Sequence, residues 1–349
     1  MGIFISTFIS GLQEPLKNFL KQDLPGAKVL DVYDGLIVYK TDLDPQKIKR
    51  LRYFNNSFLL LKRYSGYISD SPECMIREAL KIKDLNEKLS ICRFPFHNRQ
   101  FRIIVSRENQ LVPVNGEVFR QMEHKIAGIP GFRVNRAKPD LEFWFLSRSE
   151  KVSFFLLRLT KHAASEKVLH KGELQPELSD ILCRLSKPGV RDIFLDPFCG
   201  YGAIPLERAR MCPYRMIFLS DISEEQVRFC RAKAKELKKK SGKKLIVRRS
   251  DALQLVNYED GFIDRIVTDP PWGMYKELGM DIPHLYQLML SELSRVLKPG
   301  GILVLLTAQK ETFENVLESF QSRLAITVQY HILVSGKKAS VYVIKKLCP

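Results

Sequence analysis

The sequence predicts a doubly wound α/β domain in the second half of the chain, preceded by two smaller α+β units. From residue 192 onward, short β-prone segments alternate with amphipathic helical segments, an order that produces a mostly parallel sheet. Before residue 160 the strands and helices follow one another in a mixed order, which is typical of α+β domains. The chain of 349 residues also exceeds what one hydrophobic core usually serves, so several domains are expected.

Residues 1–70 predict a ferredoxin-like domain. The dipeptide Asp34-Gly35 tolerates the positive φ angles of a hairpin turn, and Asp44 followed by Pro45 marks the start of a helix. The predicted order is strand, helix, two strands, helix and strand, over the ranges 3–8, 12–20, 29–33, 36–40, 45–54 and 57–62. This βαββαβ order is that of the ferredoxin-like fold.

Residues 71–160 predict a second α+β unit. Helices are expected at 72–89 and 116–129, and strands at 101–106, 141–146 and 152–159. Gly128, Pro130 and Gly131 end the second helix. The following segment, 161–177, is polar and has no sustained apolar period, so it is interpreted as a linker that leads into a helix at 178–185.

Residues 178–349 predict the doubly wound domain itself. Strands are expected at 192–196, 216–220, 244–249, 263–268 and 302–307, with helices at 203–211, 223–240 and 283–297. The last two strand-like segments, 326–334 and 339–345, are separated by a turn at Gly336. We expect them to form an antiparallel pair at the edge of the sheet.

The composition indicates a globular protein that binds a polyanion. Lys and Arg number 56 against 39 Asp and Glu, which gives a net charge of +17 and a pI near 9.5. A field of this sign attracts nucleic acid or an anionic membrane surface, although a generally basic, solvated surface would have the same composition. The seven cysteines show no CxxC pair and no metal-ligand spacing, so reduced thiols in a cytoplasmic protein are expected. Neither a signal peptide nor a membrane-spanning segment is recognisable.

A glycine turn follows the first strand of the doubly wound domain. Asp196-Pro197-Phe198-Cys199-Gly200-Tyr201-Gly202 leads directly into a helix. The two glycines allow a tight turn and close approach of a ligand, while the helix N-terminus presents free N–H groups. A glycine turn between strand and helix also occurs without any ligand, so this motif is weak by itself.

Acidic residues follow the next two strands. Asp221 stands 25 residues after Asp196, where a carboxylate can accept hydrogen bonds from both ribose hydroxyls of a nucleoside cofactor. Asp251 and Ala252 follow the third strand, where they can reach an adenine edge. Each acid alone is equally explained as a solvated strand end or a helix cap. Three such features after three consecutive strands point to a cofactor site.

The fourth strand runs into Asp269-Pro270-Pro271-Trp272-Gly273. The prolines make a rigid loop, the acid before them can accept an N–H bond, and the indole offers a face to a base. An exocyclic amino nitrogen is weakly nucleophilic, because its lone pair is delocalised into the ring. Acceptors on its hydrogens favour the pyramidal form that attacks a methyl group in line. Asp269 and the Pro270 carbonyl are the expected acceptors, with Trp272 as the stacking platform.

These motifs resemble a known family. Residues 172–349 look like a Rossmann-fold class I methyltransferase of the amino-methylating class, in which the D/N-P-P-Y/F/W loop is catalytic. Residues 1–160 resemble the ferredoxin-like plus THUMP modules of tRNA-modifying enzymes, by the segments 101–107, 139–143 and 156–160 and the helix that starts at Gly116. The arrangement is similar to that of THUMP-domain tRNA (guanine-N2)-methyltransferases. The resemblance implies a ferredoxin-like domain at 1–70, a THUMP RNA-binding domain at 71–160, a linker at 161–177 and the methyltransferase domain at 178–349.

The resemblance also implies S-adenosylmethionine as cofactor and assigns residues to three sets. The implied catalytic residues are Asp269, Pro270, Pro271 and Trp272. The implied cofactor-binding residues are Asp196, Phe198, Gly200, Gly202, Ala203, Asp221, Ile222, Asp251, Ala252 and Asp269. The implied RNA-binding residues are Arg102, Arg107, Arg133, Arg136 and Lys138.

The expected function is methylation of an exocyclic amino group, with guanine N2 in the acceptor-stem region of tRNA as the leading target. A 23S rRNA guanine-N2 enzyme, an adenine-N6 or protein-amide methyltransferase, and a catalytically silent RNA-binding protein stay open as alternatives. The linker lacks the family's Arg-Pro-Tyr-Arg run, and Tyr201 and Ala203 stand where Ser or Thr are commoner. We expect a cytoplasmic monomer that acts on tRNA or another structured RNA, without a metal ion or a membrane, and whose N-terminal half supplies most of the RNA affinity.

Overall fold

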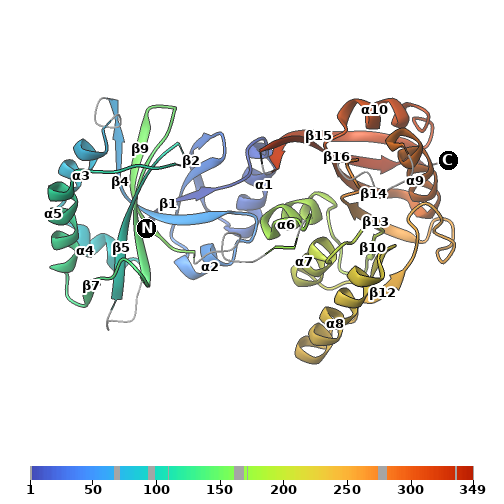
Figure 1. Cartoon of the computed structure of the whole chain (residues 1–349), viewed down its shortest axis with the longest axis horizontal. Helices are drawn as coiled ribbons and strands as arrows, with labels where there is room; N and C mark the ends of the chain where they lie inside the picture. Colours follow the sequence, from blue (N-terminus) through green and yellow to red (C-terminus); the bar gives the residue numbers. More distant parts are fainter. Residues whose placement is uncertain are drawn as a thin grey trace. The chain divides into compact units, whose positions relative to one another are not determined.

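The computed structural model describes residues 2–66, 71–92, 99–108, 110–160, 169–170, 172–273, 281–334 and 336–348. The chain forms two compact units. The first contains Met1–Phe8 and Gln13–Ala163, and the second contains Ile9–Leu12 and Ala164–Pro349. Figure 1 shows the elements of each unit in sequence colours. Most of the predicted linker, 161–168 and residue 171, lies outside the described residues.

The first part of the first unit has the predicted βαββαβ order. It consists of β1 (Gly2–Thr7), α1 (Gln13–Asp23), β2 (Lys28–Tyr33), β3 (Leu36–Thr41), α2 (Pro45–Lys49) and β4 (Asn56–Ser65). Gly35 has a φ of +75° in the turn between β2 and β3, and Asp44 caps α2 by accepting from the Gln46 N–H at 2.8 Å. The strands lie in the order β2-β3-β1-β4 and all neighbours are antiparallel, so two split βαβ units interleave.

The second part of this unit departs from the prediction in one helix. The expected helix over 72–89 is two helices, α3 (Pro72–Leu80) and α4 (Leu85–Ser90), because Lys81 caps the first and the chain turns before Asp84. Ile82 between them is buried. Two short strands were not predicted, β6 (Gln110–Leu111) and β7 (Phe132–Val134). The other elements are β5 (Arg99–Arg107), α5 (Gly116–Ala127), β8 (Leu141–Ser147) and β9 (Val152–Arg158).

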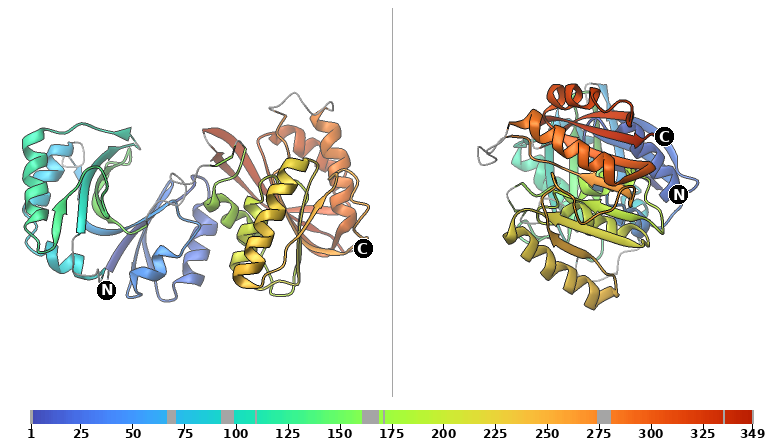
Figure 2. Two further views of the ribbon diagram at one scale, coloured as in Figure 1. Left: turned by 60° about the horizontal axis from the view of Figure 1, so that its bottom comes forward. Right: turned by 90° about the vertical axis from the view of Figure 1, so that its right-hand side faces the viewer.

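The two parts of the first unit share one sheet. β4 pairs antiparallel with β9, and the nine strands of the described residues in this unit form a single sheet in the order β2-β3-β1-β4-β9-β8-β5-β6, with β7 beside β5. The strands curve strongly (Figure 2). Apolar side chains from β1, β3, β4, β8 and β9, among them Ile5, Phe58 and Leu156, form one buried cluster across this junction. The boundary predicted near residue 70 therefore does not interrupt the hydrogen-bonded sheet.

The second unit is a mostly parallel sheet with helices, as predicted. Its described strands lie in the order β12-β11-β10-β13-β14-β16-β15, and β12 to β14 are parallel to their neighbours. β16 is antiparallel to β14, and β15 forms the edge. The strands are β10 (Ile193–Asp196), β11 (Met216–Asp221), β12 (Ile246–Arg249), β13 (Ile263–Thr268), β14 (Leu297–Thr307), β15 (Leu324–Val334) and β16 (Lys337–Lys346).

The helices of this unit mostly follow the prediction. α7 (Ala203–Met211), α8 (Glu224–Ser241) and α9 (Ile282–Val296) agree within one residue, whereas α6 (Pro176–Leu185) begins inside the predicted linker. Pro176 at the first helical position explains this start, since its ring presets the backbone for a helix. A further helix, α10 (Lys310–Glu318), was not predicted. Residues of α9 and α10 form a large buried core with the strands, which holds the sheet rigid beneath its carboxyl ends.

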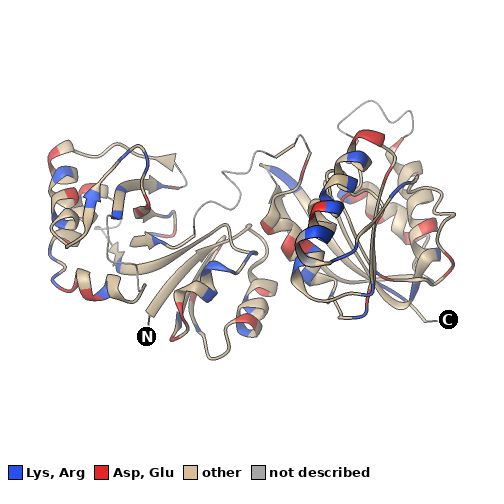
Figure 3. Cartoon of the chain, turned by 90° about the horizontal axis from the view of Figure 1, so that it is seen from below, with Lys and Arg blue, Asp and Glu red and all other residues tan. Residues whose placement is uncertain are grey.

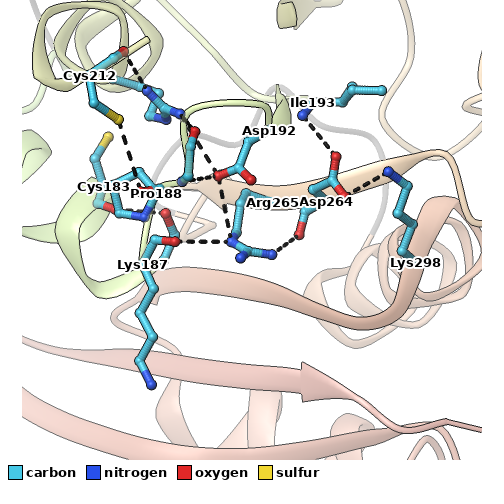
Figure 4. Close-up of polar contacts among 12 residues, drawn as sticks. Cys183, Lys187, Pro188, Asp192, Ile193, Cys212, Asp264, Arg265 and Lys298 are labelled. Atoms are coloured by element: carbon cyan, nitrogen blue, oxygen red, sulfur yellow. Dashed lines mark hydrogen bonds and ion pairs between the residues drawn. The ribbon is translucent and has the colours of Figure 1, made fainter. Parts of the chain in front are cut away.

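A polar network fastens the amino ends of β10, β13 and β14 (Figure 4). Asp264 accepts from the Ile193 N–H at 2.9 Å and from Lys298 Nζ at 2.6 Å. Asp192 lies 3.7 Å from Arg265 Nε. The central strands are thus held together at the edge opposite to the loops that carry the predicted site residues.

We expect Asp264→Ala to lower the free energy of unfolding by about 1–3 kcal/mol, because a backbone N–H and a lysine lose a partly buried acceptor. Urea denaturation of the purified variant measures this change. Asp260→Ala is the matched control, since the Asp260 side chain is 79% exposed and its pair with Arg295 contributes at most about 1 kcal/mol. Equal losses in the two variants would contradict a structural role for the network.

Candidate active site

Four acidic residues predicted from the sequence lie at one edge of the second unit's sheet. Asp196, Asp221, Asp251 and Asp269 end or follow β10, β11, β12 and β13, and these strands are parallel. β10 lies between β11 and β13, so the chain leaves the sheet in opposite directions on its two sides. Such a switch point is where ligands bind in doubly wound sheets.

The glycine turn, residues 196–202, is fastened to the neighbouring strands. Asp196 Oδ1 accepts from the Thr268 hydroxyl at 2.9 Å and from the Phe198 N–H at 3.2 Å. Gly200 and Gly202 have φ angles of +51° and +83°, which other residues rarely adopt. A Cβ on Gly202 would also lie 3.1 Å from Cys230 Sγ. Both glycines are therefore required by the backbone of the turn.

Asp221 holds the same turn from β11. Its Oδ2 accepts from the Gly200 N–H at 2.9 Å, and its Oδ1 accepts from the Ser223 N–H at 3.0 Å. With its amide oriented to donate, Gln226 adds a contact of 2.9 Å to Oδ1. The next residue, Ile222, is 64% exposed and offers an apolar surface beside the carboxylate. Sequence reasoning missed Gln226, although its place in the first turn of the helix after an acidic strand end is a usable signal.

Asp251 makes a local contact instead. Its Oδ1 accepts from the Leu253 N–H at 2.9 Å, so it caps its own turn, and Ala252 is buried. Arg249 Nε donates to the Ile222 carbonyl at 3.1 Å and connects this loop with the loop after β11. Both the capping interpretation and a ligand contact through the second carboxylate oxygen are compatible with this geometry.

The buried position of Asp196 has an electrostatic consequence. Burial raises the pKa of this carboxyl well above its usual range, and the nearby charges of Asp221 and Asp269 raise it further. Its Oδ2 atom is buried and has no hydrogen-bond partner among the described residues. A buried acceptor without a partner is costly, so this atom fits a ligand that supplies a donor.

The DPPW loop, residues 269–272, is held by two hydrogen bonds. Asp269 Oδ1 accepts from the Trp272 indole N–H at 2.8 Å, and the Trp272 carbonyl accepts from Gln309 Nε2 at 2.7 Å. Burial raises the pKa of Asp269 to about 7, and the indole donor opposes this shift. Pro270 is buried behind the loop. Gln309 was missed by sequence reasoning, but it directly follows the end of the fifth parallel strand, which is the rule that found the acidic residues.

The five predicted RNA-binding residues lie in the first unit and do not form one cluster. Glu142 pairs with Arg102, and Glu123 pairs with Arg136 at 2.7 Å. These two guanidinium charges are therefore partly neutralised. The remaining residues are exposed and form no ion pair with another described residue, but Arg133 pairs with the first half of β5 whereas Arg107 ends that strand. The exposed residues are Arg107, Arg133 and Lys138.

The described residues were also searched for metal ligands and membrane helices. They contain no group of three or more His, Cys, Asp or Glu side chains arranged to hold a metal ion. Within the same ranges, no helix combines the length and apolarity needed to cross a membrane.

We expect Gln309→Ala to loosen the DPPW loop, because the Trp272 carbonyl loses a donor worth about 1 kcal/mol. The chain has two tryptophans, so a Trp144→Phe background leaves Trp272 as the only one, and acrylamide quenching of its fluorescence should increase. Gln329→Ala, which removes an amide bonded to Glu314 on another part of the unit, is the control. Unchanged quenching in Gln309→Ala would contradict the role of this residue.

Comparison with known proteins places this site. The family described as RMKL-like, methyltransferase domain, matches residues 165–334. A tRNA (guanine(6)-N2)-methyltransferase of Thermus thermophilus is 30% identical over 255 residues, which cover 71% of this chain and 72% of the relative. The mouse tRNA (guanine(6)-N(2))-methyltransferase THUMP3 is 30% identical over 203 residues, covering 53% of this chain and 40% of the relative.

The fold agrees over the whole length. The crystal structure of TrmN from Thermus thermophilus superposes with a TM-score of 0.75, and the match covers 99% of this chain and 100% of that one at 23% identity. This likeness shows the same fold, including the Rossmann-like methyltransferase sheet. Together with the bacterial relative, it leads to one conclusion: the chain belongs to the family of tRNA (guanine-N2)-methyltransferases.

Proposed function

We propose that the chain transfers the methyl group of S-adenosylmethionine to the exocyclic N2 of a guanine in tRNA. The observation that carries this proposal is the edge at which the glycine turn, Asp221 and the DPPW loop meet, with Asp196 tied to Thr268 between them. Relatives named for the same reaction support guanine N2 over an adenine or a protein amide as the target. The family's acceptor-stem region is the proposed location, and we propose a cytoplasmic monomer as the active form.

The cofactor residues follow from the donors and acceptors at this edge. S-adenosylmethionine supplies a methyl group on a sulfonium, together with an ammonium group and two ribose hydroxyls. Asp196 offers its unpartnered Oδ2 to a donor, and Asp221 has lone pairs left for hydroxyl groups beside the exposed Ile222. The remaining proposed contacts come from Phe198, Gly200, Gly202, Ala203, Asp251 and Ala252, which line the same three loops.

The transferred group meets the DPPW loop. The Trp272 indole occupies Asp269 Oδ1, and Oδ2 has no hydrogen bond to another described residue, so it is available to an amine N–H. Asp269 and the Pro270 carbonyl would accept from the two amine hydrogens as the nitrogen becomes pyramidal. Trp272, anchored at both its indole N–H and its carbonyl, holds the base by stacking. After methyl transfer the amine releases its proton to solvent.

The first unit is the proposed main source of RNA affinity. Arg107, Arg133 and Lys138 present exposed positive charges on it, whereas Arg102 and Arg136 are held by carboxylates and can add contacts only beyond those pairs. Phosphate contacts of this kind position an RNA without reading its sequence.

The reaction itself is tested with purified protein, S-adenosylmethionine and unmodified tRNA, followed by mass spectrometry of the nucleosides. Formation of N2-methylguanosine supports the proposal. Formation of N6-methyladenosine, or methylation of 23S rRNA with untouched tRNA, would replace it with one of the alternatives.

Asp269→Ala should lower the single-turnover methylation rate by about 100-fold or more, because its acceptor acts most strongly in the transition state. Cofactor and tRNA dissociation constants should change little. Because the ionised carboxylate is the acceptor and its pKa is raised to about 7, kcat/KM of the parent should be low below pH 7 and rise to a plateau above it. Asp269→Asn, which keeps an acceptor but does not titrate, should lose this pH step. A folded Asp269→Ala with the parental rate would refute the mechanism.

Asp221→Ala should weaken S-adenosylmethionine binding by roughly 1–3 kcal/mol, about 10-fold to 100-fold, because hydroxyl donors and the Gly200 N–H lose their acceptor. Calorimetric titration measures this loss, and tRNA affinity should stay near the parental value. Glu224→Ala is the control, since this partly exposed acid three residues away pairs with Arg231 and not with the turn. Equal cofactor affinity in Asp221→Ala and the parent would exclude the assignment.

A further inference from the structure

The most basic part of the chain lies in the second unit. Residues 201–250 hold a larger excess of Lys and Arg over Asp and Glu than any segment of equal length elsewhere. Most of these cations belong to α8 and to the segment that follows it into β12, where Figure 3 shows them along the helix. The RNA-binding residues expected from the sequence were all placed in the first unit, so this concentration of charge has no assigned role.

One face of α8 carries a continuous row of cations. Its members are spaced at i, i+3, i+7, i+10 and i+11, a spacing that aligns side chains along one side of a helix. All are exposed, while Val227 and Cys230 on the opposite face are fully buried. The α8 stripe consists of Arg228, Arg231, Lys235, Lys238 and Lys239. It is about 17 Å long at the rise of 1.5 Å per residue.

Little negative charge within the protein balances the stripe. Arg231 pairs with Glu224 at 3.3 Å, and the pair between Lys233 and Glu236 lies off the stripe. Lys235, Lys238 and Lys239 form no ion pair with any described residue. Like charges one turn apart destabilise a helix by a few tenths of a kcal/mol each. The row therefore has an energetic cost that an external polyanion would offset.

Two structural explanations account for only part of the row. Cations in the last turn of a helix interact favourably with its dipole, which covers Lys238 and Lys239 but not Arg228 or Lys235. A membrane-surface helix needs large exposed apolar side chains beside its cations. The described residues of α8 include none. A phosphodiester backbone, which presents charge without requiring apolar contact, fits the stripe better.

We propose that the α8 stripe is a second RNA-binding surface, which contacts the phosphate backbone of the substrate from the methyltransferase unit. The proposal rests on the proposed function, because it takes tRNA as the ligand. α8 begins immediately after its cap Ser223, two residues beyond Asp221, so the stripe extends away from the cofactor edge of the sheet. An RNA whose base enters at Asp269 would have backbone on this side, and the stripe would add affinity and orientation without touching the reacting atoms.

The test is Lys235→Ala/Lys238→Ala/Lys239→Ala in the full chain, with tRNA binding measured over a range of salt concentrations. Losing three phosphate contacts should reduce the slope of log affinity against log salt concentration by about 2–3. Alanine favours helix, so α8 should stay folded, which circular dichroism and an unchanged S-adenosylmethionine affinity verify. The matched control is Lys310→Ala/Lys338→Ala/Lys345→Ala, which removes the same charge from exposed positions in α10 and β16. It should keep the parental slope.

Each other outcome is decisive. A parental slope in the stripe variant, or an equal reduction in the control, would overturn the proposal, the second because net charge alone would then explain the effect. Stripe-dependent binding of the parent to phosphatidylserine vesicles, with tRNA affinity unaffected by the stripe, would assign the surface to membranes instead. If the parent neither binds nor methylates tRNA, the proposed function fails. If the parent does both and the stripe variant binds equally well, only the stripe proposal fails.

Discussion

A buried hydrogen bond from the Thr268 hydroxyl to Asp196 Oδ1 connects the carboxyl ends of β13 and β10. These strands are neighbours in the sheet but are separated along the chain by two helices and two strands. The bond therefore sets how far the DPPW loop lies from the glycine turn, and both loops leave the sheet where its connections diverge. The contacts of Asp221 with the Gly200 N–H and of Gln309 with Trp272 then hold each loop in its place.

Acidic side chains gather at this edge in spite of their mutual repulsion. Burial raises the pKa values of Asp196 and Asp269, and the neighbouring carboxylates contribute at Asp196. A positively charged ligand would stabilise the ionised forms and supply the donors that Asp196 Oδ2 lacks. The same arrangement explains why the protein folds around the edge without closing it: the polar network of Asp264 and the apolar core secure the strands at their other end.

The fold was predicted well where its signals are local. Strand and helix positions in the second unit follow from hydrophobic period, and the capped start of α2 follows from Asp44 and Pro45. The errors arose where long-range packing decides. The apolar period continues through 72–89, yet burial of Ile82 between α3 and α4 interrupts the helix. β6 and β7 are too short for alternation to reveal them. The pairing of β4 with β9 joins residues about a hundred positions apart, which no local pattern reports.

The sequence by itself determined which residues end the parallel strands, because a turn's glycines, prolines and acids are chosen by the local backbone. It thereby identified Asp196, Asp221, Asp251 and Asp269 as neighbours at one edge. Only the tertiary structure decided what each one touches: Asp251 caps its own turn, Asp221 holds Gly200, and Asp269 holds the indole of Trp272. Hydrogen-bond partners and burial depend on segments that the core brings together from distant parts of the chain, and these contacts set the pKa values and the free acceptors on which the chemistry depends.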